Sequence, residues 1–175
     1  MAQPSAFAVV ENILRESLVV HGVVPLQVEK STTSAGGFRN LIVVDEVLGC
    51  DFLSQQAAAI AIPTLLGYDT QLCDRHTPIT DASNHYQPTL LQLFIRGNPF
   101  RGSAGLSQAA QTWTKKLLTS GNLQALVVYG SPYILDRLLP LPPELACIFS
   151  YGQMPLAQEI VMKTLFKTSL SLSQE

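Results

Sequence analysis

Three apolar segments of this chain end alike, in a glycine that is followed two or three residues later by a proline. They are FIRGNP at residues 94–99, VVYGSP at residues 127–132 and FSYGQMP at residues 149–155. Glycine allows a sharp turn or a close approach between backbones, and proline has the fixed φ preferred at the first position of a helix. Each segment therefore predicts a buried strand that changes into a helix within a few residues.

Strand-like and helix-like segments alternate beyond residue 38. The apolar, strand-like runs are residues 40–46, 65–67, 89–100, 123–130 and the first part of 146–166. The helix-like segments begin near residue 50 or 51, at residue 106 and after residue 155. Strands that are apolar on both faces and alternate with helices are typical of a parallel sheet between two helix layers. The expected fold is α/β, a three-layer αβα sandwich with a mostly parallel, doubly wound sheet.

Residues 5–20 have a different pattern. Their apolar residues recur at intervals of three and four, the spacing of one face of a helix: Phe7, Val10, Leu14 and Leu18. Ser5 follows a proline and is a suitable N-cap for this helix. The mixed stretch that follows, with Pro25 and two adjacent glycines, indicates an extended linker. The predicted organisation is a helix and linker over residues 1–37 and a sandwich domain over residues 38–175.

The composition excludes several classes of function. A formal net charge of −2, from 11 basic and 13 acidic residues, offers no basic surface for a nucleic acid. Glu11, Arg15 and Glu16 interrupt the N-terminal apolar stretch, which argues against a signal peptide and a membrane span. The three cysteines lack the spacing of a disulfide framework or a zinc site, and neither phosphate-binding glycine motif is present. We therefore expect a cytoplasmic protein without a metal or a cofactor.

Polar side chains lie where the predicted strands end. Parallel strands bring their carboxyl ends to one edge of the sheet, and open α/β sheets bind ligands outside that edge. The strand-end residues expected to face a substrate are Asp45, Arg96, Asn98, Ser131 and Tyr151. For any single turn, a tight connection between strand and helix is the simpler role, because turn residues are selected first for geometry.

No residue pattern in the chain predicts a catalytic centre. Asp45 and Glu46 are adjacent on a strand and would point to opposite faces, so they do not form an acid–base pair. His76 lies near Cys73 and Asp74, but their spacing fits no metal-ligand or nucleophile motif, and a polar loop is expected there. We predict no catalytic residue and no metal ligand.

Two segments resemble a known domain. LQALVVYGSPYIL, at residues 123–135, resembles a strand-Gly-Asn-Pro-Tyr segment in the C-terminal αβα sandwich domain of family 3 glycoside hydrolases, the β-glucosidases and β-N-acetylglucosaminidases. ACIFSYGQMPLAQEIVMKTLF, at residues 146–166, is similar to the next segment of that domain. ENILRESLVV, at residues 11–20, resembles the helix that closes the family's catalytic barrel and begins its interdomain linker. The resemblance covers roughly residues 7–166.

The resemblance implies that the catalytic chemistry lies elsewhere. Family members carry their aspartate nucleophile, and in one branch a histidine loop, on an N-terminal (β/α)8 barrel that this chain is too short to contain. The Lys-His-Phe-Pro-Gly type of loop is absent, and Asp81 in ITDAS fits a turn better than a nucleophile. The chain is expected to be an accessory domain of a β-N-acetylhexosaminidase or β-glucosidase, inactive alone. Its expected partners are the barrel, in the same polypeptide or a separate chain, and a carbohydrate.

The alternative function is that of a standalone flavodoxin-like binding or protein-interaction module. In that case the apolar helix face around Phe7 and Val10 would pack on this domain or on a partner, and an exposed face predicts a homodimer. Two further classes are excluded. A receiver domain needs an aspartate after its third strand, and an independent α/β-hydrolase needs a Gly-x-Ser-x-Gly elbow, and the chain has neither.

Overall fold

The computed structural model of the chain describes residues 5–26, 37–45, 50–78, 87–95, 107–130, 134, 138 and 140–167. Within these residues, six strands form one sheet with the order β1-β6-β5-β4-β2-β3. The strands are β1 (Val19–His21), β2 (Phe38–Val44), β3 (Tyr68–Cys73), β4 (Thr89–Ile95), β5 (Leu123–Gly130) and β6 (Ala146–Ser150). The helices are α1 (Ala6–Glu16), α2 (Ala58–Leu65), α3 (Gln108–Ser120) and α5 (Pro155–Phe166).

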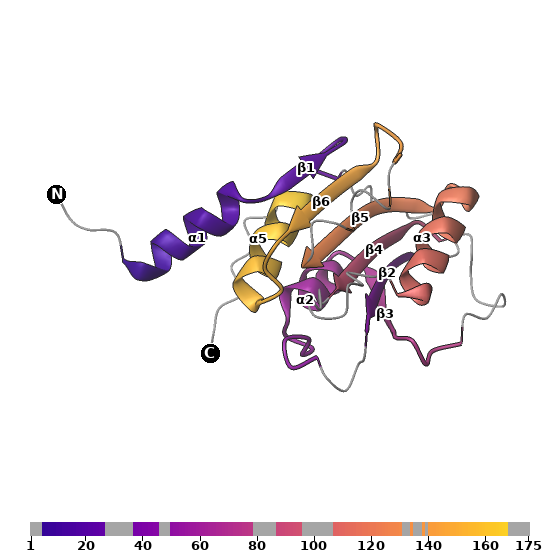
Figure 1. Cartoon of the computed structure of the whole chain (residues 1–175), viewed down its shortest axis with the longest axis horizontal. Coiled ribbons are helices and arrows are strands. Elements are labelled where there is room, and N and C mark those ends of the chain that lie inside the picture. The colour runs from indigo at the N-terminus through magenta and orange to yellow at the C-terminus, as the bar shows by residue number, and fades with distance from the viewer. Residues whose placement is uncertain are drawn as a thin grey trace.

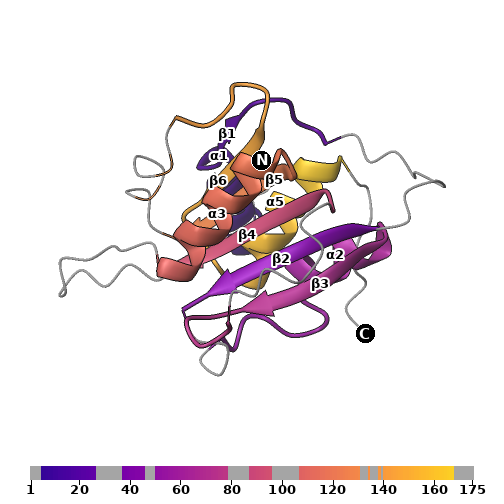
Figure 2. The same ribbon diagram turned by 90° about the vertical axis from the view of Figure 1, so that its right-hand side faces the viewer.

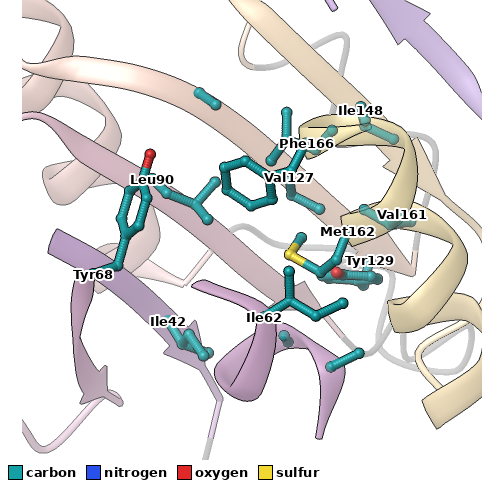
Figure 3. Close-up of a cluster of buried hydrophobic side chains, with 14 of the residues drawn as sticks. Ile42, Ile62, Tyr68, Leu90, Val127, Tyr129, Ile148, Val161, Met162 and Phe166 are labelled. Atoms are coloured by element: carbon teal, nitrogen blue, oxygen red, sulfur yellow. The ribbon is translucent and has the colours of Figure 1, made fainter. Parts of the chain in front are cut away.

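Helices cover both faces of the sheet and confirm the predicted α/β sandwich. Strands β2 to β6 pair in parallel, with α2 and α5 on one face and α3 on the other (Figures 1 and 2). Figure 3 shows the core on the α2 and α5 side, where Ile62, Met162 and Tyr129 gather. Every residue of β4 and of β6 is buried. This burial on both faces is why their sequences lack the alternation of a half-exposed strand.

The helix predicted over residues 5–20 is shorter in the structure, because α1 ends at Glu16. Val19 and Val20, at the end of the predicted helix, instead form an additional strand with His21. Strand β1 pairs antiparallel with β6, so that Val20 lies opposite Ile148. Gly22 follows with a φ of +73°, and an added Cβ there would collide with the carbonyl oxygen of Leu145. Leu26 N then donates to Leu165 O at 2.7 Å. Three residues are too few to show a strand period, which is why the sequence did not reveal β1; the domain boundary at residue 37 stays a prediction.

The segment after β2 differs from its predicted structure. Helical spacing begins near residue 50, but α2 begins at Ala58, and residues 51–57 are not helical. Leu53 N donates to Cys50 O at 3.1 Å in a turn of this stretch. The strand expected at residues 65–67 is also wrong, because Leu65 ends α2 and Gly67, with a φ of +88°, turns the chain into β3.

Serine N-caps begin two of the helices, and a glycine ends one of them. Ser5 Oγ accepts a hydrogen bond from Ala8 N at 3.2 Å at the start of α1, and Ser107 Oγ accepts one from Ala110 N at 3.2 Å at the start of α3. Gly121 ends α3 in the left-handed conformation, with a φ of +71°. Among the described helices, none is both long enough and apolar enough to cross a bilayer.

Arg39 is a charged side chain within the core. It is the second residue of β2 and only 4% exposed, and its Nε donates a hydrogen bond to Thr89 Oγ1 at 3.1 Å. Its guanidinium carbon lies 5.2 Å from the centre of the Trp113 ring, a cation–π distance. No described atom accepts a hydrogen bond from Nη2. Burial lowers the pKa of Arg39 from its ordinary value, because the charged form loses its hydration.

Replacing Arg39 with methionine is expected to stabilise the chain by about 1 kcal/mol. Methionine retains most of the buried volume, and apolar replacement of buried charges can gain ~1–4 kcal/mol; the lost contacts with Thr89 and Trp113 offset part of that gain. Urea unfolding followed by the fluorescence of Trp113, the single tryptophan, measures the change. Arg39→Ala is the control and should be less stable than Arg39→Met, because it leaves a cavity. A methionine variant less stable than the wild-type chain would contradict this account.

Candidate functional site

The candidate site is the edge of the sheet where β2, β4, β5 and β6 end. Asp45 directly follows β2 and is half-buried. Tyr151 directly follows β6, is 55% exposed, and packs edge-to-face on Phe149 with ring centres 4.8 Å apart. Strands β4 and β5 lie between β2 and β6. Three strand spacings of ~4.8 Å therefore separate β2 from β6. Asp45 and Tyr151 lie at opposite ends of the edge, about 14 Å apart.

The other three candidate residues, Arg96, Asn98 and Ser131, lie outside the described residues. Each directly follows, or lies close after, a described strand end: Ile95 ends β4 and Gly130 ends β5. The structure therefore places the two strand ends that precede these residues, between Asp45 and Tyr151 along the edge. Their role in facing a ligand stays a prediction.

A stack of aromatic rings lies at this end of the sheet. The ring of Phe52, from the segment after β2, stacks on Phe94 with centres 5.4 Å apart, and Phe94 stacks on Tyr129 at 4.2 Å. Chain order in the sheet reverses at β2, whose neighbours are β3 and β4, and doubly wound proteins bind ligands at such a switch point. The edge is therefore supported from one face by packed rings that come from β4, β5 and the β2–α2 segment.

Buried amide side chains connect the strands beneath the edge. Gln92 Nε2 donates to Asn40 Oδ1 and to Ala59 O, each at 2.7 Å. Tyr129 OH donates to Gln92 Oε1 at 3.3 Å, and burial raises the pKa of Tyr129 well above its ordinary value. All these groups are neutral over the physiological pH range. The network orders β2, β4 and β5 but has no group that could act as an acid or a base near pH 7.

Two further glutamines donate hydrogen bonds to backbone carbonyl groups closer to the edge. Gln153 Nε2 donates to Ile95 O at 3.0 Å and to Tyr129 O at 3.1 Å. Gln158 Nε2, from α5, donates to Phe52 O at 3.0 Å and to Gln153 O at 2.9 Å. No motif in the sequence indicates the role of either glutamine. One signal was present in the sequence, a glutamine among the apolar residues of the last predicted helix. Gln158 is fully buried there, and a buried amide needs hydrogen-bond partners.

The glycines of two predicted turns occupy crowded positions, as the sequence pattern indicated. Gly130 has a φ of +122°, and an added Cβ would collide with Ile95 O. At Gly152 an added Cβ would lie 2.9 Å from the Cβ of Ala157 and 3.3 Å from Leu14 Cδ2, on α1. Gly97, the third glycine, lies outside the described residues.

The turn after β3 is polar, as predicted for the segment around His76. Asp74 Oδ1 accepts hydrogen bonds from His76 N and from Thr77 Oγ1, both at 2.9 Å. Cys73 instead lies in the core on the α3 side, where burial raises the pKa of its thiol. The thiol of Cys73 and the imidazole of His76 are thus in different environments. Among the residues that the structure describes, no three His, Cys, Asp or Glu side chains are grouped to hold a metal ion.

Comparisons with solved structures find the same fold in longer enzymes. The chain resembles a glycoside hydrolase family 3 β-N-acetylglucosaminidase from Paenibacillus sp. str. FPU-7, with a TM-score of 0.59 and 11% identity over 95% of this chain and 33% of that one. It also resembles the β-N-acetylglucosaminidase from Thermotoga maritima, with a TM-score of 0.50 and 9% identity over 93% of this chain and 32% of that one. The chain thus spans about a third of the length of either enzyme.

A comparison with curated protein sequences finds no match. The family model described as the bacterial glycosyl hydrolase family 3 C-terminal domain matches residues 31–167, which are most of the chain and include strands β2 to β6. This match agrees with the resemblance in residues 123–135 and 146–166. The chain therefore belongs to the family of bacterial glycosyl hydrolase family 3 C-terminal domains.

Proposed function

We propose that this chain is an accessory domain of a glycoside hydrolase, which supports a separate catalytic domain and lines one side of its substrate cleft. The family match carries this proposal, because the family is defined as a C-terminal domain. The two structural neighbours described above are β-N-acetylglucosaminidases about three times as long as this chain. We therefore favour a β-linked N-acetylhexosamine as the substrate of the whole enzyme, ahead of a β-glucoside.

The chemistry of the edge supports a role without catalysis. Hydrolysis of a glycosidic bond ordinarily uses two carboxyl groups about 5–9.5 Å apart, one on each side of the bond. Among the described residues that directly follow β2, β4, β5 and β6, Asp45 is the one with a carboxyl group, and Asp74 follows the neighbouring strand β3. Asp74 already accepts two hydrogen bonds within its own turn. The aromatic ring of Tyr151 offers a surface for a sugar ring, so the edge is suited to binding.

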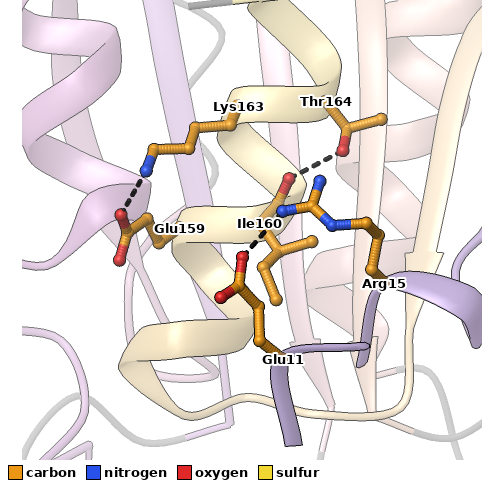
Figure 4. Close-up of polar contacts among 6 residues, drawn as sticks. All are labelled: Glu11, Arg15, Glu159, Ile160, Lys163 and Thr164. Carbon is orange, nitrogen blue, oxygen red and sulfur yellow. Dashed lines mark hydrogen bonds and ion pairs between the residues drawn. The ribbon is translucent and has the colours of Figure 1, made fainter. Parts of the chain in front are cut away.

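Helix α1 provides the contact with the catalytic domain in this proposal. It extends away from the sandwich (Figure 1) and none of its residues is buried. Phe7, Val10 and Ile13 are 64%, 48% and 60% exposed, which is unusual for a helix with so many apolar residues. Leu14 lies against Gly152, and α1 lies beside α5, while the ion pairs Glu11–Arg15 and Glu159–Lys163 stay within their own helices (Figure 4).

The first test is the mass of the native polypeptide, measured by immunoblot of source cells with an antibody against this chain. A band of roughly 50–60 kDa, the size of this chain with a (β/α)8 barrel, is expected. A band near 19 kDa would contradict a barrel in the same polypeptide. If the band lies near 19 kDa, the native protein is purified together with whatever it binds. A larger second chain would then indicate a catalytic domain on another polypeptide, and a second copy of this chain would indicate a homodimer formed through α1.

Replacing Tyr151 with alanine is expected to weaken substrate binding without slowing the chemical step. In the enzyme that contains this domain, KM for 4-nitrophenyl N-acetyl-β-glucosaminide should rise about five- to tenfold while kcat changes little, because the ring contributes binding alone. Leu65→Ala is the matched control, since Leu65 is also exposed, at 64%, but ends α2 away from the candidate edge. Equal KM values for both variants and the wild-type enzyme would rule out a role for Tyr151 in the cleft.

A further inference from the structure

Gln153 lies in the turn between β6 and α5, and its side chain reaches across the ends of two other strands. Its Nε2 donates to Ile95 O at 3.0 Å and to Tyr129 O at 3.1 Å. Ile95 is the last residue of β4, and Tyr129 is the last but one of β5. A primary amide has two N–H donors, and both are used here. One side chain thus joins the ends of three neighbouring strands, β4, β5 and β6.

The position of Gln153 is itself fixed from the helix that follows. Gln158, fully buried on α5, donates from Nε2 to Gln153 O at 2.9 Å. The same Nε2 donates to Phe52 O at 3.0 Å, and Oε1 accepts from Ala59 N at 3.4 Å. Through Gln158, the β6–α5 turn is also tied to the segment after β2 and to the start of α2.

The space around the Gln153 amide is closed on the side of β5. An added Cβ at Gly130 would lie 2.8 Å from Gln153 Nε2 and would collide with Ile95 O, the acceptor of one of its hydrogen bonds. The φ of Gly130, +122°, is also a conformation that side-chain-bearing residues rarely adopt. Gly130 and Gln153 therefore form a matched pair: the bare backbone of one makes room for the amide of the other.

We infer that Gln153 is a positioning residue, which holds the ends of β4, β5 and β6, where the predicted turns start, in a fixed arrangement through the two protons of its amide. Ile95 directly precedes Arg96, Gly130 directly precedes Ser131, and Tyr151 lies two residues before Gln153. Of the candidate substrate-facing residues, Tyr151 lies in the described segment after β6, while Arg96, Asn98 and Ser131, which follow the ends of β4 and β5 in the sequence, lie outside the described residues. The functional consequence rests on the proposed function; the hydrogen bonding itself does not.

Two substitutions of Gln153 in the full chain test the hydrogen bonding. Gln153→Met removes both donors at similar length, and the ratio of folded to unfolded chain should fall by about 30-fold at every pH. Gln153→Glu places an ionised carboxylate against two carbonyl oxygens at pH 7 and should be less stable still. When protonated, this carboxyl can donate one hydrogen bond, so its pKa in the folded chain should exceed the ordinary value near 4.3.

The raised pKa gives a distinct pH dependence. The stabilising contribution of the protonated carboxyl is complete below about pH 4.3 and is lost as the pH rises through the folded-state pKa. Gln153→Glu should therefore approach or exceed the stability of Gln153→Met near pH 4 and fall below it at pH 7. In NMR spectra of the wild-type chain, both Gln153 amide protons should exchange slowly with solvent. Parallel pH profiles of the two variants, or rapid exchange of both protons, would overturn the inference.

Kinetics of the enzyme that contains this domain test the functional consequence. Gln153→Met should raise KM about as much as Tyr151→Ala does and leave kcat nearly unchanged, because the residue acts through the turns and does not touch the reacting atoms. A raised KM for Tyr151→Ala with a normal KM for Gln153→Met would overturn the positioning role alone. Unchanged KM values for both, with the pH profiles as expected, would overturn the proposed cleft-lining function while the hydrogen bonding stands.

Discussion

Replacing Gly130 with alanine is expected to destabilise the folded chain by more than about 3 kcal/mol, which is a large part of the stability of most domains. Two costs add. The φ of +122° is strained for any residue with a Cβ, at roughly 1–3 kcal/mol. The new methyl group also has no space, because Ile95 O lies where it would be placed, and crowding of this kind costs about 1–3 kcal/mol more. Urea unfolding followed by circular dichroism measures the loss.

Gly121→Ala is the matched control for this prediction. Gly121 also has a positive φ, of +71°, but no heavy atom lies within 4 Å of an added Cβ there. Alanine at this position should cost only the left-handed conformation, about 1–2 kcal/mol. If the two variants lose the same stability, the crowding at the end of β5 contributes nothing and the close approach between Gly130 and Ile95 is not a constraint.

A marked loss of stability at alkaline pH is expected as well, because several buried groups must give up protons there. Burial raises the pKa of Cys147 from 9.0 to about 11. The folded chain thus retains this proton more strongly than the unfolded chain does. The stabilising contribution is complete below pH 9 and is lost as the pH rises toward 11, in total roughly 2–3 kcal/mol for this thiol. Burial also raises the pKa of Tyr68 and of Tyr129, so the decline continues at higher pH.

Unfolding by urea between pH 7 and pH 11, in the presence of a reductant, measures this decline. Cys147→Ala is the control: the variant should be less stable at pH 7 because of the lost volume, but its stability should fall less steeply between pH 9 and pH 11. Equal slopes for the variant and the wild-type chain would show that the Cys147 thiol does not contribute to the alkaline loss.

Structural elements that follow from a repeated sequence pattern could be predicted, and elements that depend on single tertiary contacts could not. The strands that are buried on both faces lack alternation, so β2, β4, β5 and β6 were recognisable as the centre of a parallel sheet. The start of α2 was misplaced because residues 50–57 have helical spacing, although the ring of Phe52 is held on Phe94 and its carbonyl on Gln158. Tertiary contacts of this kind override local spacing.

The candidate edge was predictable in position but not in detail. The glycine and proline of each turn indicated where the strands end, and Gly130 and Gly152 are crowded as such turns require. The hydrogen bonds of Gln153 join residues 58 and 24 positions apart, and one hydrogen bond of Gln158 spans 106 positions. A single sequence has no local pattern for such pairs. A glutamine within an apolar segment indicates only that its amide has partners somewhere in the fold.

The short strand β1 covers an edge of the sheet on which other chains could otherwise assemble. Without β1, the outer backbone groups of β6 would be unpaired along a fully buried, apolar strand, which is the kind of edge on which other chains assemble into continuous sheets. Strand β1 occupies that edge, is only three residues long, and is followed by the turn at Gly22, so it offers little length for a further strand. The family match begins at residue 31, after β1. Strand β1 therefore lies outside the part of the chain that the family model matches, yet it protects that part from intermolecular β-pairing.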